Sequence, residues 1–206
     1  MTPARSEVFA RTYQEYLCQI RQIDFLAKAD ILGLEKQDDS LLIPVYNTLY
    51  RFDHNGIETT DSKELSPALQ VIVCKYILTC PLELKASNSQ LQPYREFKDA
   101  APLVTHFTTN TSHLLETVFA GKLPALKERC LEIGGKVQET EVYDLSFLFY
   151  AFPRIPVIVN FNDKDELFSA ACSILYNSSA ANYLDMECLS MTGTLLSGIL
   201  THPTVL

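Results

Sequence analysis

The chain has 206 residues, 47% of them hydrophobic and 20% charged, which is enough apolar material for one hydrophobic core. Its 25 acidic and 17 basic side chains give a net charge of −8, and this charge disfavours the phosphate backbone of nucleic acids and anionic lipid headgroups as partners. We therefore expect a single globular domain over residues 1–206 that binds neither nucleic acid nor membranes.

The six cysteines are dispersed and fall mostly at apolar positions of helical patterns, where a free thiol packs as a small hydrophobic side chain. They lack the spacing of metal ligands, so we predict no metal or iron–sulfur site belonging to the chain itself. The first residues have no apolar export segment, and prolines and Arg154 interrupt the most hydrophobic run, residues 147–159. These features predict a cytoplasmic protein without a membrane span.

The first predicted element is a helix, because apolar residues over 9–27 are spaced three and four apart, and Gly33 is expected to end this region. Two runs within residues 41–52 are rich in leucine, aromatic and β-branched residues and predict strands. The sequence Asp-His-Asn-Gly at 53–56 favours a tight turn, and residues 57–60 are expected to return as a third strand.

Ser66, followed by proline, predicts the N-terminus of a core helix. Periodicity then fades over residues 82–102, which we predict to be a long surface loop with a helical turn at 94–98. Two further helices are expected, one over residues 103–118 and one that runs from Pro124 to the Gly-Gly pair at 134–135.

Residues 145–152 and 155–161 alternate as neighbouring strands do. The spacing of apolar residues predicts a short helix over 168–175 and a long last helix over 184–199, for which Asp185 and Glu187 supply an acidic first turn or an exposed face. The expected fold class is α+β, with five or six helices around a small, mostly antiparallel sheet.

Asp163, Asp165 and Glu166 cluster where a predicted strand ends and the short helix begins. Carboxylates there cap free backbone N–H groups, or they act as a general acid and base or bind a cation. Arg154 is the one charge in a connection framed by two prolines, where it pairs with a carboxylate or meets an anionic ligand. No serine or cysteine lies in an activated context, so catalytic residues stay unassigned.

His106 and His113 lie seven residues apart on one predicted helix and would share a face. The rise of about 1.5 Å per residue separates them by roughly 10 Å, too far for one metal ion. They either border the buried face, or one of them lines a pocket or acts as a lone axial ligand. A bound ligand is expected between this helix and the segment 154–165.

The order of short motifs along the chain resembles the prokaryotic family catalogued as domain of unknown function 3786. The motifs that carry this resemblance are Lys75-Tyr76-Ile77-Leu78, Tyr94-Arg95-Glu96-Phe97, Ile133-Gly134-Gly135, Phe152-Pro153-Arg154-Ile155-Pro156 and Asp165-Glu166-Leu167-Phe168. The family has no established activity. Its members occur mainly in anaerobic bacteria and archaea, and some are fused to a four-cysteine iron–sulfur module like that of corrinoid proteins. This chain has Tyr176-Asn177 where the family would carry Phe-Asp, which removes a carboxylate.

We thus expect a non-catalytic ligand-binding or accessory protein with no cofactor of its own. The resemblance alone links it to corrinoid or iron–sulfur one-carbon metabolism, through a bound tetrapyrrole or an iron–sulfur or corrinoid partner protein. One alternative is an enzyme that uses a corner formed by Arg154, Asp163, Asp165 and Glu166. The other is a subunit that binds a protein partner through its last helix.

Overall fold

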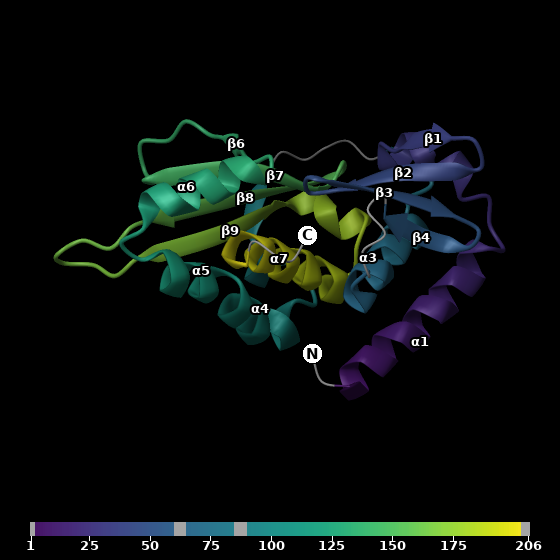
Figure 1. Ribbon diagram of the computed structural model, residues 1–206, viewed down its shortest axis with the longest axis horizontal. Coiled ribbons are helices and arrows are strands. Elements are labelled where there is room, and N and C mark those ends of the chain that lie inside the picture. The colour runs from purple at the N-terminus through teal and green to yellow at the C-terminus, as the bar shows by residue number, and fades with distance from the viewer. Residues whose placement is uncertain (1–2, 60–64, 85–89, 203–206) are drawn as a thin grey trace.

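The computed structural model describes residues 3–59, 65–84 and 90–202, and the side chains of residues 7–59, 65–84 and 90–202. Figure 1 shows two sheets side by side along the long axis of the molecule, with helix α7 (Met186–Thr201) at the centre. All strand pairs within the sheets are antiparallel. The predicted α+β class is confirmed, with two sheets in place of one.

The first sheet follows the chain order, β1 (Glu35–Gln37), β2 (Ser40–Val45), β3 (Thr48–Asp53) and β4 (Gly56–Thr59). The predicted turn is confirmed: Asp53 accepts a hydrogen bond from the Asn55 N–H at 2.7 Å, and Gly56 has the positive φ of 127° that disfavours other residues. Position 60 of the predicted returning strand lies outside the described residues.

Two short helical pieces separate the first helix from this sheet. Helix α1 (Pro3–Ile20) ends earlier than the apolar spacing predicts, and η1 (Leu26–Lys28) and α2 (Ala29–Leu32) follow it. Gly33 ends α2 with a left-handed φ of 71°, as predicted. The continuous helix predicted over 9–27 is therefore wrong over residues 21–27, where the side chain of Phe25 is buried in the core.

The second sheet has the order β5-β9-β8-β7-β6, with bounds β5 (Leu91–Pro93), β6 (Lys136–Val137), β7 (Leu145–Phe152), β8 (Ile155–Asn162) and β9 (Ala171–Asn177). Strands β7 and β8 confirm the two predicted neighbours. The helix predicted over 168–175 is wrong, because this segment is strand β9, which pairs with β8 on one side and β5 on the other. Of the predicted loop over 82–102, residues 85–89 lie outside the described residues, and Tyr94–Glu96 forms the expected helical turn, η2.

The remaining helices are α3 (Pro67–Leu78), α4 (Val104–Asn110), α5 (Ser112–Phe119) and α6 (Leu123–Glu132), with the 3-10 turns η3 (Ala101–Leu103) and η4 (Ser178–Asn182). The Ser66 side chain caps α3 by accepting from the Leu69 N–H at 3.2 Å, as predicted. The single helix predicted over 103–118 is wrong. Thr111, at φ −127° and ψ −94°, breaks it into α4 and α5.

Three tyrosines, of which Tyr94 and Tyr176 are buried and Tyr46 is half-buried, hold helix α7 in place. The hydroxyl groups of Tyr46, in the β2–β3 turn, and Tyr94, in η2, donate to the carbonyls of Thr192 and Met186, each at 2.7 Å. Tyr176, on β9, donates to the Leu189 carbonyl at 3.3 Å. Burial raises the pKa of Tyr46 and Tyr176 well above the usual value, so both stay protonated donors.

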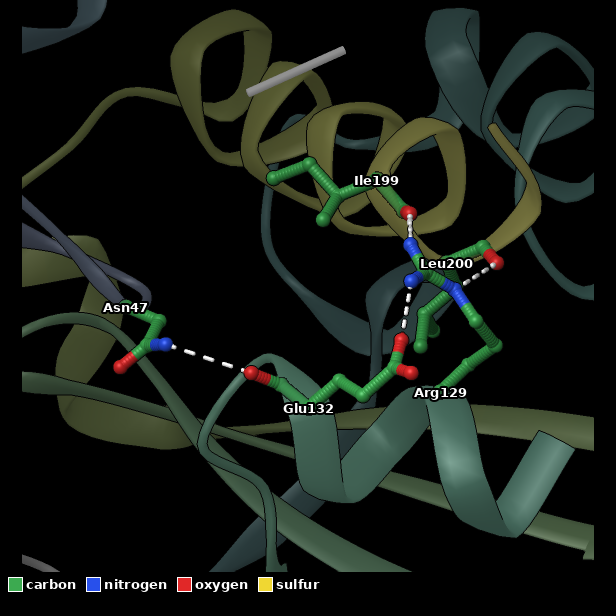
Figure 2. Close-up of polar contacts among 5 residues, drawn as sticks. All are labelled: Asn47, Arg129, Glu132, Ile199 and Leu200. Carbon is green, nitrogen blue, oxygen red and sulfur yellow. Dashed lines mark hydrogen bonds and ion pairs between the residues drawn. The ribbon is translucent and has the colours of Figure 1, made fainter. Parts of the chain in front are cut away.

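Arg129, on α6, satisfies carbonyl groups at the other end of α7. Its guanidinium donates from Nη2 to the Ile199 carbonyl at 2.8 Å and from Nε to the Leu200 carbonyl at 3.4 Å (Figure 2). The same guanidinium forms an ion pair with Glu132, whose own carbonyl accepts from the Asn47 side chain at 3.4 Å. A cation at a helix C-terminus complements the helix dipole, so these contacts stabilise α7 where its last carbonyls lack helical partners.

Candidate functional site

A cavity of about 330 Å³ lies between helices α3, α4 and α7, with one side chain contributed by α1. Its walls combine apolar groups with a smaller set of polar ones. The lining residues are Phe9, Ser66, Ala68, Leu69, Ile72, Leu103, His106, Asn110, Glu187, Ser190, Met191, Thr194, Leu195 and Gly198. Mostly apolar walls with a few polar groups are typical of small-molecule sites.

Helix α7 forms the longest wall of the cavity. Its lining residues recur three or four positions apart from Glu187 to Gly198, so they share one face of the helix. At about 1.5 Å per residue, this wall is roughly 16 Å long. A Cβ atom at Gly198 would have no heavy atom of the described residues within 4 Å, so the absence of a side chain there leaves space among them. The cavity is therefore elongated along α7.

His106 and Asn110 form a linked pair on the α4 wall. The Asn110 amide nitrogen donates to the His106 carbonyl at 2.8 Å and lies 2.5 Å from His106 Nδ1. Since the carbonyl accepts only, the amide group is oriented with its nitrogen toward His106, and Nδ1 is then an acceptor. In the neutral ring the proton is on Nε2, and Asn110 selects this tautomer.

The charge on the cavity wall comes from Glu187, in the first turn of α7. Asp185, two residues earlier, caps α7: its carboxylate accepts from the Cys188 N–H at 2.9 Å and forms an ion pair with Lys75 Nζ at 2.8 Å. Burial alone would raise the pKa of Asp185, but the hydrogen bonds from Lys75 and the Cys188 N–H lower it. Glu187 forms no ion pair with any described residue. Asp185 is thus neutralised within the fold, whereas the Glu187 carboxylate remains available.

Of the six residues that the sequence singled out, His106 lines this cavity and the other five do not. His113 is an exposed residue of α5, on the far side of the break at Thr111. The shared helical face predicted for the two histidines therefore does not exist. The expectation that a histidine and the segment 154–165 line one cavity is wrong for the cavity described here.

Arg154 lies in the β7–β8 turn, where its side chain binds backbone carbonyl groups. Its guanidinium donates to the carbonyls of Ile31 and Asp30, both at 2.9 Å, at the end of α2. Arg154 and Asp163 flank opposite ends of the eight-residue strand β8. Because a strand rises about 3.3 Å per residue, the two residues are more than about 20 Å apart. The predicted corner of Arg154, Asp163, Asp165 and Glu166 is consequently not formed, because the whole length of β8 lies between Arg154 and the three acidic residues.

Asp163 organises the base of the β8–β9 loop rather than a helix N-terminus. Its carboxylate accepts from the N–H groups of Gly121 at 2.6 Å and Lys164 at 2.8 Å. Gly121 follows α5, so the loop does approach this helix, at the end opposite to His113. Asp163 therefore joins the second sheet to the α5–α6 connection.

Asp165 shapes the tip of the same loop. Its carboxylate accepts from the N–H groups of Leu167 and Phe168, both at 2.7 Å, and these bonds lower the pKa of Asp165. Glu166 is exposed, and the Phe168 side chain is 72% exposed, which contradicts its predicted place on a buried helical face. The carboxylates of this loop satisfy backbone donors, as capping groups do, but in a turn.

No three His, Cys, Asp or Glu side chains gather as a metal-binding group in the part of the chain that the structure describes. All six cysteines are free thiols. Burial raises the pKa of Cys74 and Cys130 to about 12, so these thiols are protonated and unreactive. None of the described helices is both long and apolar enough to span a membrane.

Most of the polar cavity residues were missed by the sequence interpretation, which counted only the apolar stripe of the last helix. Ser190, Thr194 and Gly198 recur every four residues beside that stripe. A line of small and hydroxyl-bearing residues next to an apolar face was the signal for an unfilled groove along α7.

Together these features define an α+β protein with an elongated, helix-walled cavity. The chain belongs to the family catalogued as domain of unknown function 3786, whose model matches residues 24–198. This result confirms the resemblance, and the matched region includes every cavity residue except Phe9. No curated protein and no solved structure matches the chain.

Proposed function

We propose that this protein binds a small, mostly apolar molecule in the cavity along α7 and acts as a binding or accessory protein. The observation that carries the proposal is the cavity itself, since ligand sites commonly have volumes of about 300 to 1,000 Å³ and apolar walls with a few polar groups. Its volume of about 330 Å³ is at the lower end of that range. This favours a compact ligand.

The other functions considered have less support. An enzyme that uses Arg154 together with Asp163 lacks its site, because β8 separates these residues. A subunit that binds a partner through the last helix is disfavoured, since α7 packs against α3, α4, α5 and α6 within the chain. An association with corrinoid or iron–sulfur one-carbon metabolism rests on the family resemblance, and a compact cavity gives no support for an enclosed tetrapyrrole.

The proposal is tested with 1-hexanol, a neutral probe with an apolar body and one hydroxyl group. We expect saturable binding in a chemical-shift titration, with a dissociation constant on the order of 1 mM, which corresponds to about −4 kcal/mol. The perturbed signals should belong to residues of the α3, α4 and α7 walls. Perturbations confined to other surfaces would disprove the proposed site.

A blocking variant and a matched control make this test specific. In Gly198→Leu the new side chain enters open space in the cavity, so the protein should fold and lose hexanol binding. Ala125→Leu adds the same side chain at an exposed position of α6 and should bind like the wild type. Equal hexanol binding by the two variants would contradict the proposal.

A further inference from the structure

Three polar side chains of the cavity wall offer hydrogen-bond acceptors, whereas His106 offers its Nε2–H as a donor. The Thr194 hydroxyl donates to the Ser190 carbonyl at 3.2 Å, which leaves its oxygen to accept. The Asn110 amide nitrogen donates to His106, which leaves its oxygen exposed to other donors. Glu187 offers a carboxylate, which accepts only. A ligand that donates hydrogen bonds would complement these three groups.

The charge on the wall has one sign. No lysine or arginine is found among the cavity-lining residues that the structure describes, whereas Glu187 is one of them. The nearby cation, Lys75, is paired with Asp185 at 2.8 Å and packs over the Tyr16 ring at 5.3 Å. This end of α7 therefore presents a carboxylate that forms an ion pair with none of the described lysines and arginines.

The same negative charge affects a neighbouring tyrosine. The pKa of Tyr94 is raised to about 12, mainly by burial, and the charges of Asp185 and Glu187 raise it further while a hydrogen bond with Ser190 opposes them. The net charge of −8 adds a long-range preference for cations.

We propose that the ligand is an amphipathic amine, whose ammonium group pairs with Glu187 and whose apolar body lies along the α7 groove. The ammonium group supplies three donors, and the Glu187 carboxylate is an acceptor. The side chains of Leu69, Met191 and Leu195 line the part of the groove that receives the apolar body. This inference rests on the proposed function and names the chemical class of its ligand.

The experiment compares three probes of equal length that differ in charge: hexylammonium, 1-hexanol and hexanoate. At pH 7 we expect hexylammonium to bind about 3- to 10-fold more tightly than hexanol, the range for a partly exposed, charge-assisted contact. Hexanoate should bind more weakly than either. The preference for the amine should decrease as sodium chloride is raised, because salt screens exposed charges, while hexanol binding should not weaken.

Glu187→Gln keeps the shape of the side chain and removes its charge, so the variant should bind hexylammonium and hexanol equally. Glu35→Gln removes the same charge from β1, in the other part of the fold, and should keep the preference. Urea unfolding midpoints establish that both variants fold.

The two proposals fail in different ways. If hexanol binds in the cavity but hexylammonium is no better, or if Glu187→Gln keeps the preference, the amine inference is overturned and the binding function stands. If neither probe binds in the cavity, the binding function itself is wrong.

Discussion

The two glycines of helix α7 should respond oppositely to one substitution. Gly193 and Gly198 lie in the same helix, and replacing a helical glycine by alanine usually adds about 1 kcal/mol to the free energy of unfolding. Their surroundings differ. A Cβ atom at Gly198 would meet open space, whereas one at Gly193 would lie 2.6 Å from Phe107 Cε2 and 2.6 Å from the Tyr176 hydroxyl.

Neither neighbour of Gly193 is free to move away. The Phe107 ring is stacked on Tyr94 with centroids 4.4 Å apart, and the Tyr176 hydroxyl is held by the Leu189 carbonyl. Overpacking in a well-packed core costs about 1 to 3 kcal/mol. After the gain in helix propensity of about 1 kcal/mol, Gly193→Ala should lose about 0 to 2 kcal/mol, while Gly198→Ala should gain about 0.5 to 1 kcal/mol.

Urea unfolding followed by circular dichroism measures both variants against the wild type. Because the propensity gain is common to both, the difference between them isolates the packing cost and should be about 1 to 3 kcal/mol. Equal stabilisation of the two variants would refute the close packing of α7 against Phe107 and Tyr176. Equal destabilisation would refute the open space at Gly198.

Three further predictions concern single side chains. Arg129→Met keeps the apolar stem but removes the donors to the last carbonyls of α7, so urea unfolding should show a loss of about 1 to 3 kcal/mol, and an unchanged midpoint would contradict this role. The pKa of Asp185 is lowered in the folded state, so its stabilising effect is complete above about pH 4 and is lost as the pH falls further. Asp185→Asn can still cap α7, and its urea unfolding midpoint should depend less on acid pH than that of the wild type. Parallel pH profiles of the two proteins would count against the pair with Lys75. Asp165→Ala should accelerate amide hydrogen exchange at Leu167 and Phe168 while the unfolding midpoint stays the same, and protection equal to the wild type would show that other contacts hold the loop.

The sequence predicted well those elements whose signals are local. Ser66-Pro67 predicted the start of α3 through a capping serine and a proline, and the Asp-His-Asn-Gly sequence predicted the turn of the β3–β4 hairpin. The apolar spacing after Asp185 likewise predicted α7. In each case the residues that decide the structure are neighbours in the chain.

Strand β9 was missed because its structure depends on distant partners. Phe168, Ala171, Cys172 and Leu175 have helical spacing, yet Ile174 and Tyr176 are buried two residues apart as in a strand. Pairing with β8 and β5 satisfies the backbone of this segment and decides between the two patterns. The spacing of apolar residues within this segment does not indicate that pairing.

The set of residues around the cavity could not be read from the sequence for a similar reason. That one of the two histidines lines a pocket was one of several alternatives, and the residues across the cavity from His106 come from α3 and α7, which are far away in sequence. The emphasis on Arg154 and Asp163 followed from their charge, and the structure assigns both to backbone hydrogen bonds. Charged residues near turns often serve the backbone, and only tertiary contacts reveal which of them do.

The anchoring of α7 also bears on how the cavity would discriminate between ligands. Tyrosines 46, 94 and 176 hold its first half through carbonyl contacts, and Arg129 holds its last carbonyls. A wall secured at both ends is preorganised, so a ligand need not pay for ordering it. Such a groove should select ligands by their length. In a series of linear amines, affinity should rise with each methylene that fits along the wall and drop once the chain exceeds its length.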